Sequence, residues 1–202
     1  LYLSGNNLSS VDVTKNIELT QLSILQNNFT SINITNNTKL KVFDAFSNQL
    51  TGVDVTNNKD LEQLVLRDNN IVNIDINQNT KLNTLLLQNN KIERAFLRNG
   101  NNSAIITFDI SGNPDLKCIA VNDVNFANTN WTNKDAAANY NTDCNAEWEV
   151  YTEDTVLSTS LNNIPGLDDD GDGVITYEEA QAFTGDLDLS GKNITSVKGL
   201  EA

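Results

Sequence analysis

The sequence predicts a mainly β solenoid built from 21-residue coils, followed by a small helical unit. Three observations lead to this fold class. Asparagine recurs every 21 residues through the first half of the chain, apolar residues stand at fixed offsets around each asparagine, and the composition becomes acidic and helix-permitting beyond residue 144. Because a unit of this length cannot bury its apolar edge alone, successive units are expected to stack.

An asparagine marks the same position in five successive repeats. Around it lies the pattern L-x-x-L-x-L-x-x-N-x-L, for example Leu19, Leu22, Ile24, Asn27 and Phe29. Alternate apolar residues of a short strand point to one side, and the asparagine amide can satisfy backbone groups where the chain leaves the strand. The pattern resembles the leucine-rich repeat, and we assign its asparagines to structure and not to a ligand site. These are Asn6, Asn27, Asn48, Asn69 and Asn90.

A second extended segment recurs in each coil of the array, which we assign to residues 1–118. Its alternation of β-branched residues predicts a short strand on the convex side, where many other repeat classes carry a helix. The coils are therefore expected to be flat and mostly β. This form resembles the short-period repeats of bacterial surface proteins, particularly secreted proteins of the Bacteroidetes type. The segments are 11–13, 32–34, 53–55, 74–76 and, after an irregular insertion, 108–110.

Residues 119–145 are expected to cap the array, because the final coil would otherwise expose its apolar edge. The bulky side chains of Phe126, Trp131 and Tyr140 suit packing in such a cap better than ligand stacking. Cys118 and Cys144 are close enough in sequence to close one modest loop, so we expect a disulfide; two buried free thiols are the alternative. Structural zinc needs four ligands, and the chain has two cysteines and no histidine.

Residues 146–186 are predicted to form a helical calcium-binding cap. Within them, residues 168–179 read DDDGDGVITYEE, with Asp at positions 1, 3 and 5, Gly at 6 and Glu at 12. This arrangement resembles the EF-hand loop, in which carboxylates converge on Ca²⁺ and glycine makes the tight turn. A solvated acidic loop is the alternative. A single such loop in a chain without methionine favours a structural role for the ion over a sensing role. The ligands implied by the resemblance are Asp168, Asp170, Asp172, the backbone carbonyl of Val174, Thr176 and Glu179.

Residues 187–202 are interpreted as the first coil of a following array. Their LDLSGKNITSV aligns with LYLSGNNLSSV at the start of the chain, so that Leu187 matches Leu1 and Val197 matches Val11. Lys192 departs from the pattern, because it replaces the asparagine. The chain is therefore expected to be part of a longer protein with such units in tandem, or to stack head to tail with copies of itself.

The charge balance and residue types exclude several classes of function. A net charge of −14 disfavours nucleic acids and anionic membrane surfaces, which need basic side chains. No apolar run approaches the roughly 20 residues of a membrane span. The chain has no histidine and no acidic pair outside residues 168–179 that the repeat would bring together, so we expect no enzymatic activity.

Outward positions of the concave sheet are where we expect a partner to bind. Apolar residues occupy several of these positions, although Ser or Asn would favour solubility, and charged residues flank them. Scattered surface apolars are the alternative. The prediction is an extracellular binding or adhesion module at a bacterial surface that recognises protein or glycan; the alternative is an architectural stalk or filament module. The candidate residues are Leu25, Asp44, Phe46, Val65, Arg67 and Leu86.

Overall fold

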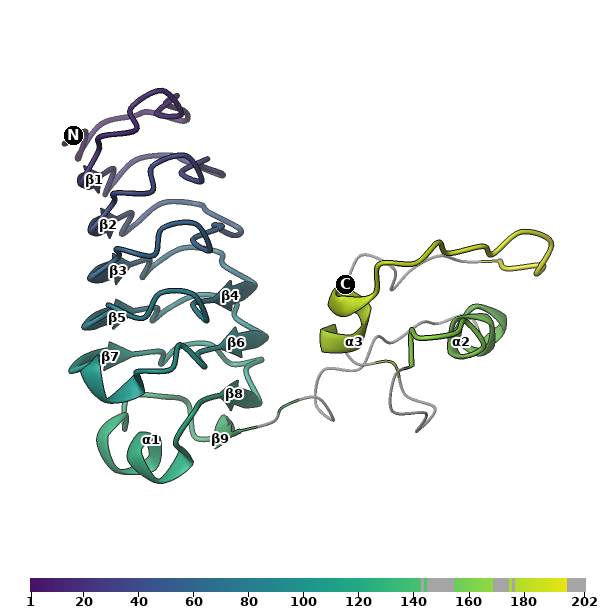
Figure 1. The fold of residues 1–202 in the computed structure, drawn as a ribbon. Helices are drawn as coiled ribbons and strands as arrows, with labels where there is room; N and C mark the ends of the chain where they lie inside the picture. The colour runs from purple at the N-terminus through teal and green to yellow at the C-terminus, as the bar shows by residue number, and fades with distance from the viewer. Residues whose placement is uncertain (143, 145–154, 169–174, 176, 196–202) are drawn as a thin grey trace. The chain divides into compact units, whose positions relative to one another are not determined.

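The computed structural model describes residues 1–142, 144, 155–168, 175 and 177–195. The chain divides into two compact units, residues 1–142 and residues 143–202. The first unit is a mainly β solenoid of stacked coils with parallel strands (Figure 1), which confirms the predicted fold class. The finer boundaries expected after residues 118, 145 and 186 stay predictions.

Sheet A contains one short strand from each of five coils, and all its strands are parallel. Its central residues are apolar and buried, and they pair in register as Leu22, Phe43, Leu64, Leu85 and Phe108. This register follows the 21-residue step of the sequence as far as Leu85. The strands are β1 (Gln21–Ser23), β2 (Val42–Asp44), β3 (Gln63–Val65), β5 (Thr84–Leu86) and β7 (Thr107–Asp109).

Sheet B lies on the other side of the coils and is also parallel (Figure 1). Its central residues Ile74, Ala95, Ile119 and Tyr140 are buried in the same core. Of the second extended segments expected, 74–76 overlaps the strand β4, whereas 11–13, 32–34 and 53–55 are not strands in the structure. The strands are β4 (Asn73–Asp75), β6 (Arg94–Phe96), β8 (Cys118–Ala120) and β9 (Asn139–Asn141).

The assignment of residues 108–110 to this second series was wrong. Phe108 pairs with Leu85 in sheet A, and the segment of sheet B in the preceding half-coil is β6. The step from Leu82 to Ile105 is 23 residues (105 − 82), and a 3-10 turn, η1 (Asn102–Ala104), lies within the longer stretch. The two extra residues shift the 21-residue repeat. The alternation of apolar and polar residues is the same in both sheets, so it does not show which sheet a strand joins.

The asparagines of the repeat close the backbone between neighbouring coils. Asn69 Oδ1 accepts a hydrogen bond from the Leu50 N–H at 2.9 Å. Its Nδ2 donates to the carbonyls of Ala45 at 2.9 Å and Leu66 at 3.0 Å. Asn27, Asn48 and Asn90 make the same set of bonds in their own coils. Each amide therefore satisfies groups that would otherwise be buried without partners, as predicted.

A second row of asparagines, which the sequence analysis missed, follows the segments of sheet B. Asn37, Asn58 and Asn79 are fully buried and again stand 21 residues apart. Asn58 Nδ2 donates to the carbonyl of Ile34 at 3.0 Å and to that of Asn37 at 2.9 Å. The same period was visible in the sequence at Asn16, Asn37, Asn58 and Asn79, so the signal was available.

Asn113 continues the first row after the insertion, and the residue before each asparagine of the row takes a left-handed backbone conformation, with φ between 54° and 72°. Such a φ is uncommon outside glycine, although Asn and Asp adopt it more readily than most residues. At Gly112 an added Cβ would also lie 2.5 Å from Asn89 Oδ1, so glycine is required there for space as well. The residues are Gly5, Gln26, Ser47, Asp68, Asn89 and Gly112.

Lysines pair with carboxylates of neighbouring coils on the exposed edge of the array. Lys39 Nζ lies 2.7 Å from a Glu18 oxygen, and Lys81 Nζ lies 2.5 Å from an Asp60 oxygen. All four side chains are largely exposed. Exposed pairs contribute about 0–1 kcal/mol each, so burial and the amide bonds dominate the stability of the array.

The far end of the array is closed by helix α1 (Val124–Asn130) and the residues after it. The Trp131 ring stacks on Phe108 with centroids 4.3 Å apart, and its Nε1 donates to the Ile105 carbonyl at 3.0 Å. Phe126 and Tyr140 meet Trp131 edge-on, and the Tyr140 hydroxyl donates to the Trp131 carbonyl at 2.6 Å. These aromatic residues pack, as expected, and cover the last coil.

The second unit contains helices α2 (Thr155–Asn162) and α3 (Tyr177–Ala182). Within it, Asp188 Oδ1 accepts from the Ser190 N–H at 3.0 Å and from its Oγ at 2.6 Å, and Gly191 has a φ of 66°. Asp109, Ser111 and Gly112 form the same turn in the array. Every helix among the described residues is too short or too polar for a membrane span. The apolar cluster of the second unit contains Leu157, Leu161, Leu167 and Ile175, with Leu189 and Ile194 packed against it.

We expect Asn69→Ala to destabilise the array by roughly 2–3 kcal/mol, because it leaves the buried Leu50 N–H without a partner. The measurement is urea unfolding followed by circular dichroism. Asn6→Ala is the matched control at the same repeat position: Asn6 is exposed and donates only to Leu3 and Ser4. Its cost should stay below about 1 kcal/mol, and equal losses in the two variants would contradict the proposed role of the buried amides.

Candidate functional site

The six residues predicted to form a ligand surface lie together on the outer side of sheet A. Parallel pairing places Ser23, Asp44, Val65, Leu86 and Asp109 in one column. Successive backbone hydrogen bonds continue that register two residues further along each coil. There, the second column contains Leu25, Phe46, Arg67, Gln88 and Ser111. We call these two columns the sheet A face.

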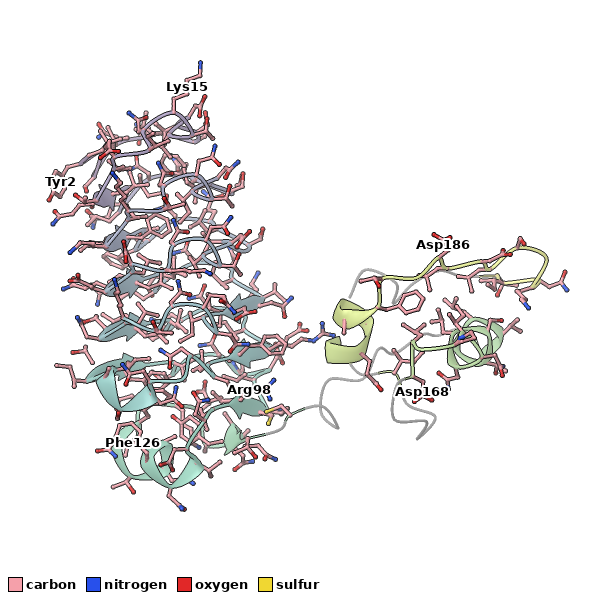
Figure 2. The ribbon with its side chains drawn as sticks, viewed as in Figure 1. Tyr2, Lys15, Arg98, Phe126, Asp168 and Asp186 are labelled. Carbon is pink, nitrogen blue, oxygen red and sulfur yellow. The ribbon has the colours of Figure 1, made fainter. Side chains whose placement is uncertain are left out.

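All six candidate side chains on the sheet A face are half-buried. Their neighbours along each strand, such as Leu64 and Leu66, are fully buried in the core. The face is therefore a rigid platform: its side chains stand on strands whose inward residues are close-packed. At the first coil, Tyr2 is 72% exposed and projects from the array, whereas Phe126 marks the opposite, capped end (Figure 2).

Arg67 is the basic residue of the sheet A face, and it lies over an aromatic ring. Its Cζ is 4.1 Å from the centroid of Phe46, a cation–π arrangement. Its Nε is buried and has no hydrogen-bond partner among the described residues. Arg67 also forms no ion pair with a carboxylate in the part of the chain that the structure describes.

Acidic residues of the sheet A face and of its turns already accept hydrogen bonds. Asp44 Oδ1 accepts from the Phe46 N–H at 3.1 Å, and Asp109 Oδ1 accepts from Ser111. Asp68 accepts from Asn89 Nδ2 at 2.7 Å. These carboxylates shape turns and stabilise the edge of the sheet.

On the other side of the coils, Asp12, Asp54 and Asp75 occupy one repeat position. Each accepts a hydrogen bond from the N–H two residues later. Burial raises the pKa of Asp75, and the charge of Asp54 adds to the increase, whereas Arg98 opposes it. The role of these carboxylates is to hold turns, and within the described ranges no group of three or more acidic, Cys or His side chains is arranged to bind a metal.

Two of the six predicted calcium ligands lie among the described residues. Asp168 is half-buried, and Glu179 is half-buried in the first turn of α3. Ile175, between them in sequence, is buried in the apolar cluster of the second unit. Asp170, Asp172, Val174 and Thr176 lie outside the described residues, as does Val197 of the coil alignment.

Cys118 and Cys144 form the predicted disulfide. Both residues are buried. The bond joins β8 to the segment that follows β9, and beside it Arg98 Nη1 donates to the Thr142 carbonyl at 3.3 Å. The alternative of two free thiols is therefore excluded.

Neither a known family model nor a curated protein matches the chain. Two solved bacterial structures are similar to it. The functional domain of InlJ from Listeria monocytogenes, which includes a cysteine ladder, is 26% identical with a TM-score of 0.42, and the match covers 60% of this chain and 24% of that one. A leucine-rich-repeat protein of Leptospira interrogans is 19% identical with a TM-score of 0.48, over 70% of this chain and 38% of the other. The chain thus spans a minor part of both.

Proposed function

We propose that the chain is an extracellular recognition module that binds a protein or glycan partner on the sheet A face. The observation that carries this proposal is the grouping of Leu25, Phe46, Val65 and Leu86, half-buried apolar side chains, around Arg67 on one rigid surface. Apolar patches rimmed by charge are typical of binding surfaces. Adhesion at a bacterial surface is the setting that suits such a module.

The disulfide supports an extracellular setting. Disulfides persist in oxidising compartments and are rare in the cytosol, where thiols are kept reduced. The bond between Cys118 and Cys144 fastens the capped end of the array. Because it closes a loop of 26 residues (144 − 118), it would stabilise the cap by roughly 3 kcal/mol.

We further propose that Ca²⁺ stabilises the second unit. The ligands would be Asp168, Asp170, Asp172, Thr176 and Glu179, with the carbonyl of residue 174. When bound, the ion would supply a cross-link between the loop and α3. The buried Ile175 and the position of Glu179 in α3 support this role, because they tie the loop to the apolar cluster.

A second candidate function is architectural, with units associating end to end. The turn at Asp188, Ser190 and Gly191 repeats the geometry of an array coil, and Leu189 and Ile194 pack against the helical cluster. Leu187 is 48% exposed and is the apolar residue that would contact a further coil. Such heterologous contacts do not close and would produce filaments.

Leu86→Asp should weaken binding of a partner about tenfold or more without unfolding the array. Asp44 and Asp109 already stand in this column, so the fold tolerates the residue, whereas a buried interface does not tolerate the charge. A partner is first identified by screening the unchanged protein against an array of extracellular proteins and glycans. Surface plasmon resonance then compares the affinity of the variant and of the unchanged protein for that partner, and we expect the variant to bind about tenfold more weakly or worse. Phe46→Asp should act in the same direction.

The matched control is Asn33→Asp, which adds the same charge on the other side of the coil. Asn33 is exposed and bonds Thr35 as Asp54 bonds Thr56, so the fold is preserved. Partners should bind this variant normally. Binding that survives Leu86→Asp and Phe46→Asp would rule out the sheet A face.

Calcium at about 5 mM should stabilise the second unit by roughly 1–2 kcal/mol relative to a chelator, given a dissociation constant on the order of 10⁻⁴ to 10⁻³ M. Thermal unfolding with and without the ion measures this difference. Glu179→Gln should remove the effect, and Glu178→Gln, outside the implied ligand set, should retain it. Identical melting curves for the unchanged protein in calcium and chelator would refute the calcium proposal.

The architectural candidate predicts concentration-dependent self-association, measured by sedimentation velocity. Leu187→Glu should weaken it, because a charge would replace an exposed apolar contact. Ile106→Glu, at a side chain 84% exposed in the first unit, is the matched control and should leave association unchanged. A monomer at every concentration would eliminate this candidate.

A further inference from the structure

We propose that Arg67 is the anchor of the sheet A face and that it binds a carboxylate of a polypeptide partner, from an Asp or Glu side chain or a chain end, beside an apolar side chain. This inference rests on the proposed recognition function of that face and names the chemistry of its partner. It is carried by the unpaired state of Arg67, by its support on Phe46 and by the apolar residues around it.

The first observation is that Arg67 lacks a partner in a strongly acidic chain. Acidic residues outnumber basic residues by 27 to 13. Lys39, Lys41 and Lys81 each pair with a carboxylate of a neighbouring coil, but Arg67 pairs with none among the described residues. A half-buried guanidinium has lost part of its hydration, and a carboxylate would supply hydrogen bonds and an opposite charge in its place.

The second observation is that the guanidinium is held in place. The Phe46 ring lies 4.1 Å from Cζ, and the Nε atom is buried. Contact with the ring restrains the guanidinium, and a carboxylate binds such a group best through two parallel hydrogen bonds in the guanidinium plane. A side chain that is already ordered loses little conformational entropy on binding.

The third observation is that carboxylates of the sheet A face and of its turns already accept hydrogen bonds from other groups. Asp44 and Asp109 each accept bonds from residues two positions along their own coils, and Asp68 accepts from Asn89. These bonds hold the carboxylates at their turns. The binding position at Arg67 is therefore left for a group from outside the coil.

The surroundings favour a polypeptide over a phosphate or an acidic sugar. Val65 and Leu86 present apolar surface beside Arg67 and offer no hydrogen bonds to sugar hydroxyls, and Leu25 extends the apolar surface beyond Phe46. A net charge of −14 repels a dianion more than a single carboxylate. A carboxylate next to an apolar side chain matches both features.

The test uses the full chain and N-acetyl-L-leucine as the probe, with its neutral amide as the matched control ligand. The readout is the NMR signal of the Arg67 Nε–Hε group, whose burial slows exchange with water. We expect saturable shifts with a dissociation constant on the order of millimolar for the acid, and at least about fivefold weaker binding of the amide. No shift up to roughly 50 mM, or equal binding of acid and amide, would overturn the proposal.

Variants separate Arg67 from general charge effects. Arg67→Gln should abolish binding of the probe, which is monitored in this variant through the NMR signals of neighbouring backbone amides. Arg67→Lys should weaken binding severalfold, because lysine cannot form the two parallel hydrogen bonds. Lys59→Gln removes the same charge from an exposed position elsewhere and should bind normally. Equal loss in Lys59→Gln would refute a specific site, and tighter binding of inorganic phosphate or glucuronate would overturn the polypeptide assignment.

The outcome is distinguishable from failure of the proposed function. If Leu86→Asp abolishes partner binding while Arg67→Gln leaves both partner and probe unaffected, the sheet A face stands and the carboxylate inference fails. If neither variant affects the partner, the recognition function of the face fails.

Discussion

The array depends on buried amide groups that close the backbone wherever the chain leaves a strand. A thin solenoid brings main-chain N–H and C=O groups into its interior at every turn, and each must find a partner. Asn69 and its equivalents donate to carbonyls and accept from an N–H in the neighbouring coil, so one side chain satisfies groups from two coils. On the side of sheet B, the side-chain amides of the second row, from Asn37 to Asn79, donate hydrogen bonds to backbone carbonyls of the preceding coil. Apolar burial supplies the driving force, and the amides make that burial possible.

Most outward positions of sheet A carry no such structural role. Inward positions carry the core, turn positions carry asparagine and left-handed residues, and Asp44 and Asp109 shape their own turns. What remains is a set of side chains, including Phe46, Arg67 and Leu86, whose identity the fold does not dictate. Their apolar character and the guanidinium of Arg67 are the basis of the proposed recognition function.

The sequence was most informative where a period could be counted. The register of Leu22, Phe43, Leu64 and Leu85, the amide bonds and the disulfide all followed from spacing. Prediction failed at residues 108–110, because two extra residues near η1 shifted the step and the alternating pattern fits either sheet. The six face residues could be placed by period alone, but the stacking of Arg67 on Phe46 could not, because it depends on side-chain conformations across two coils. The ligand set of the calcium loop stays a prediction.

The alternating charges along the exposed edge bear on how similar coils find their correct neighbours. Residues 18, 39, 60 and 81 read Glu, Lys, Asp, Lys, so each coil meets an opposite charge in the next. If a folding chain skipped one repeat, Glu18 would face Asp60, and like charges would meet in a structure whose apolar contacts are almost interchangeable. The energies are small, yet they distinguish arrangements that the core cannot. The charges on this edge thus favour the correct order of neighbouring coils.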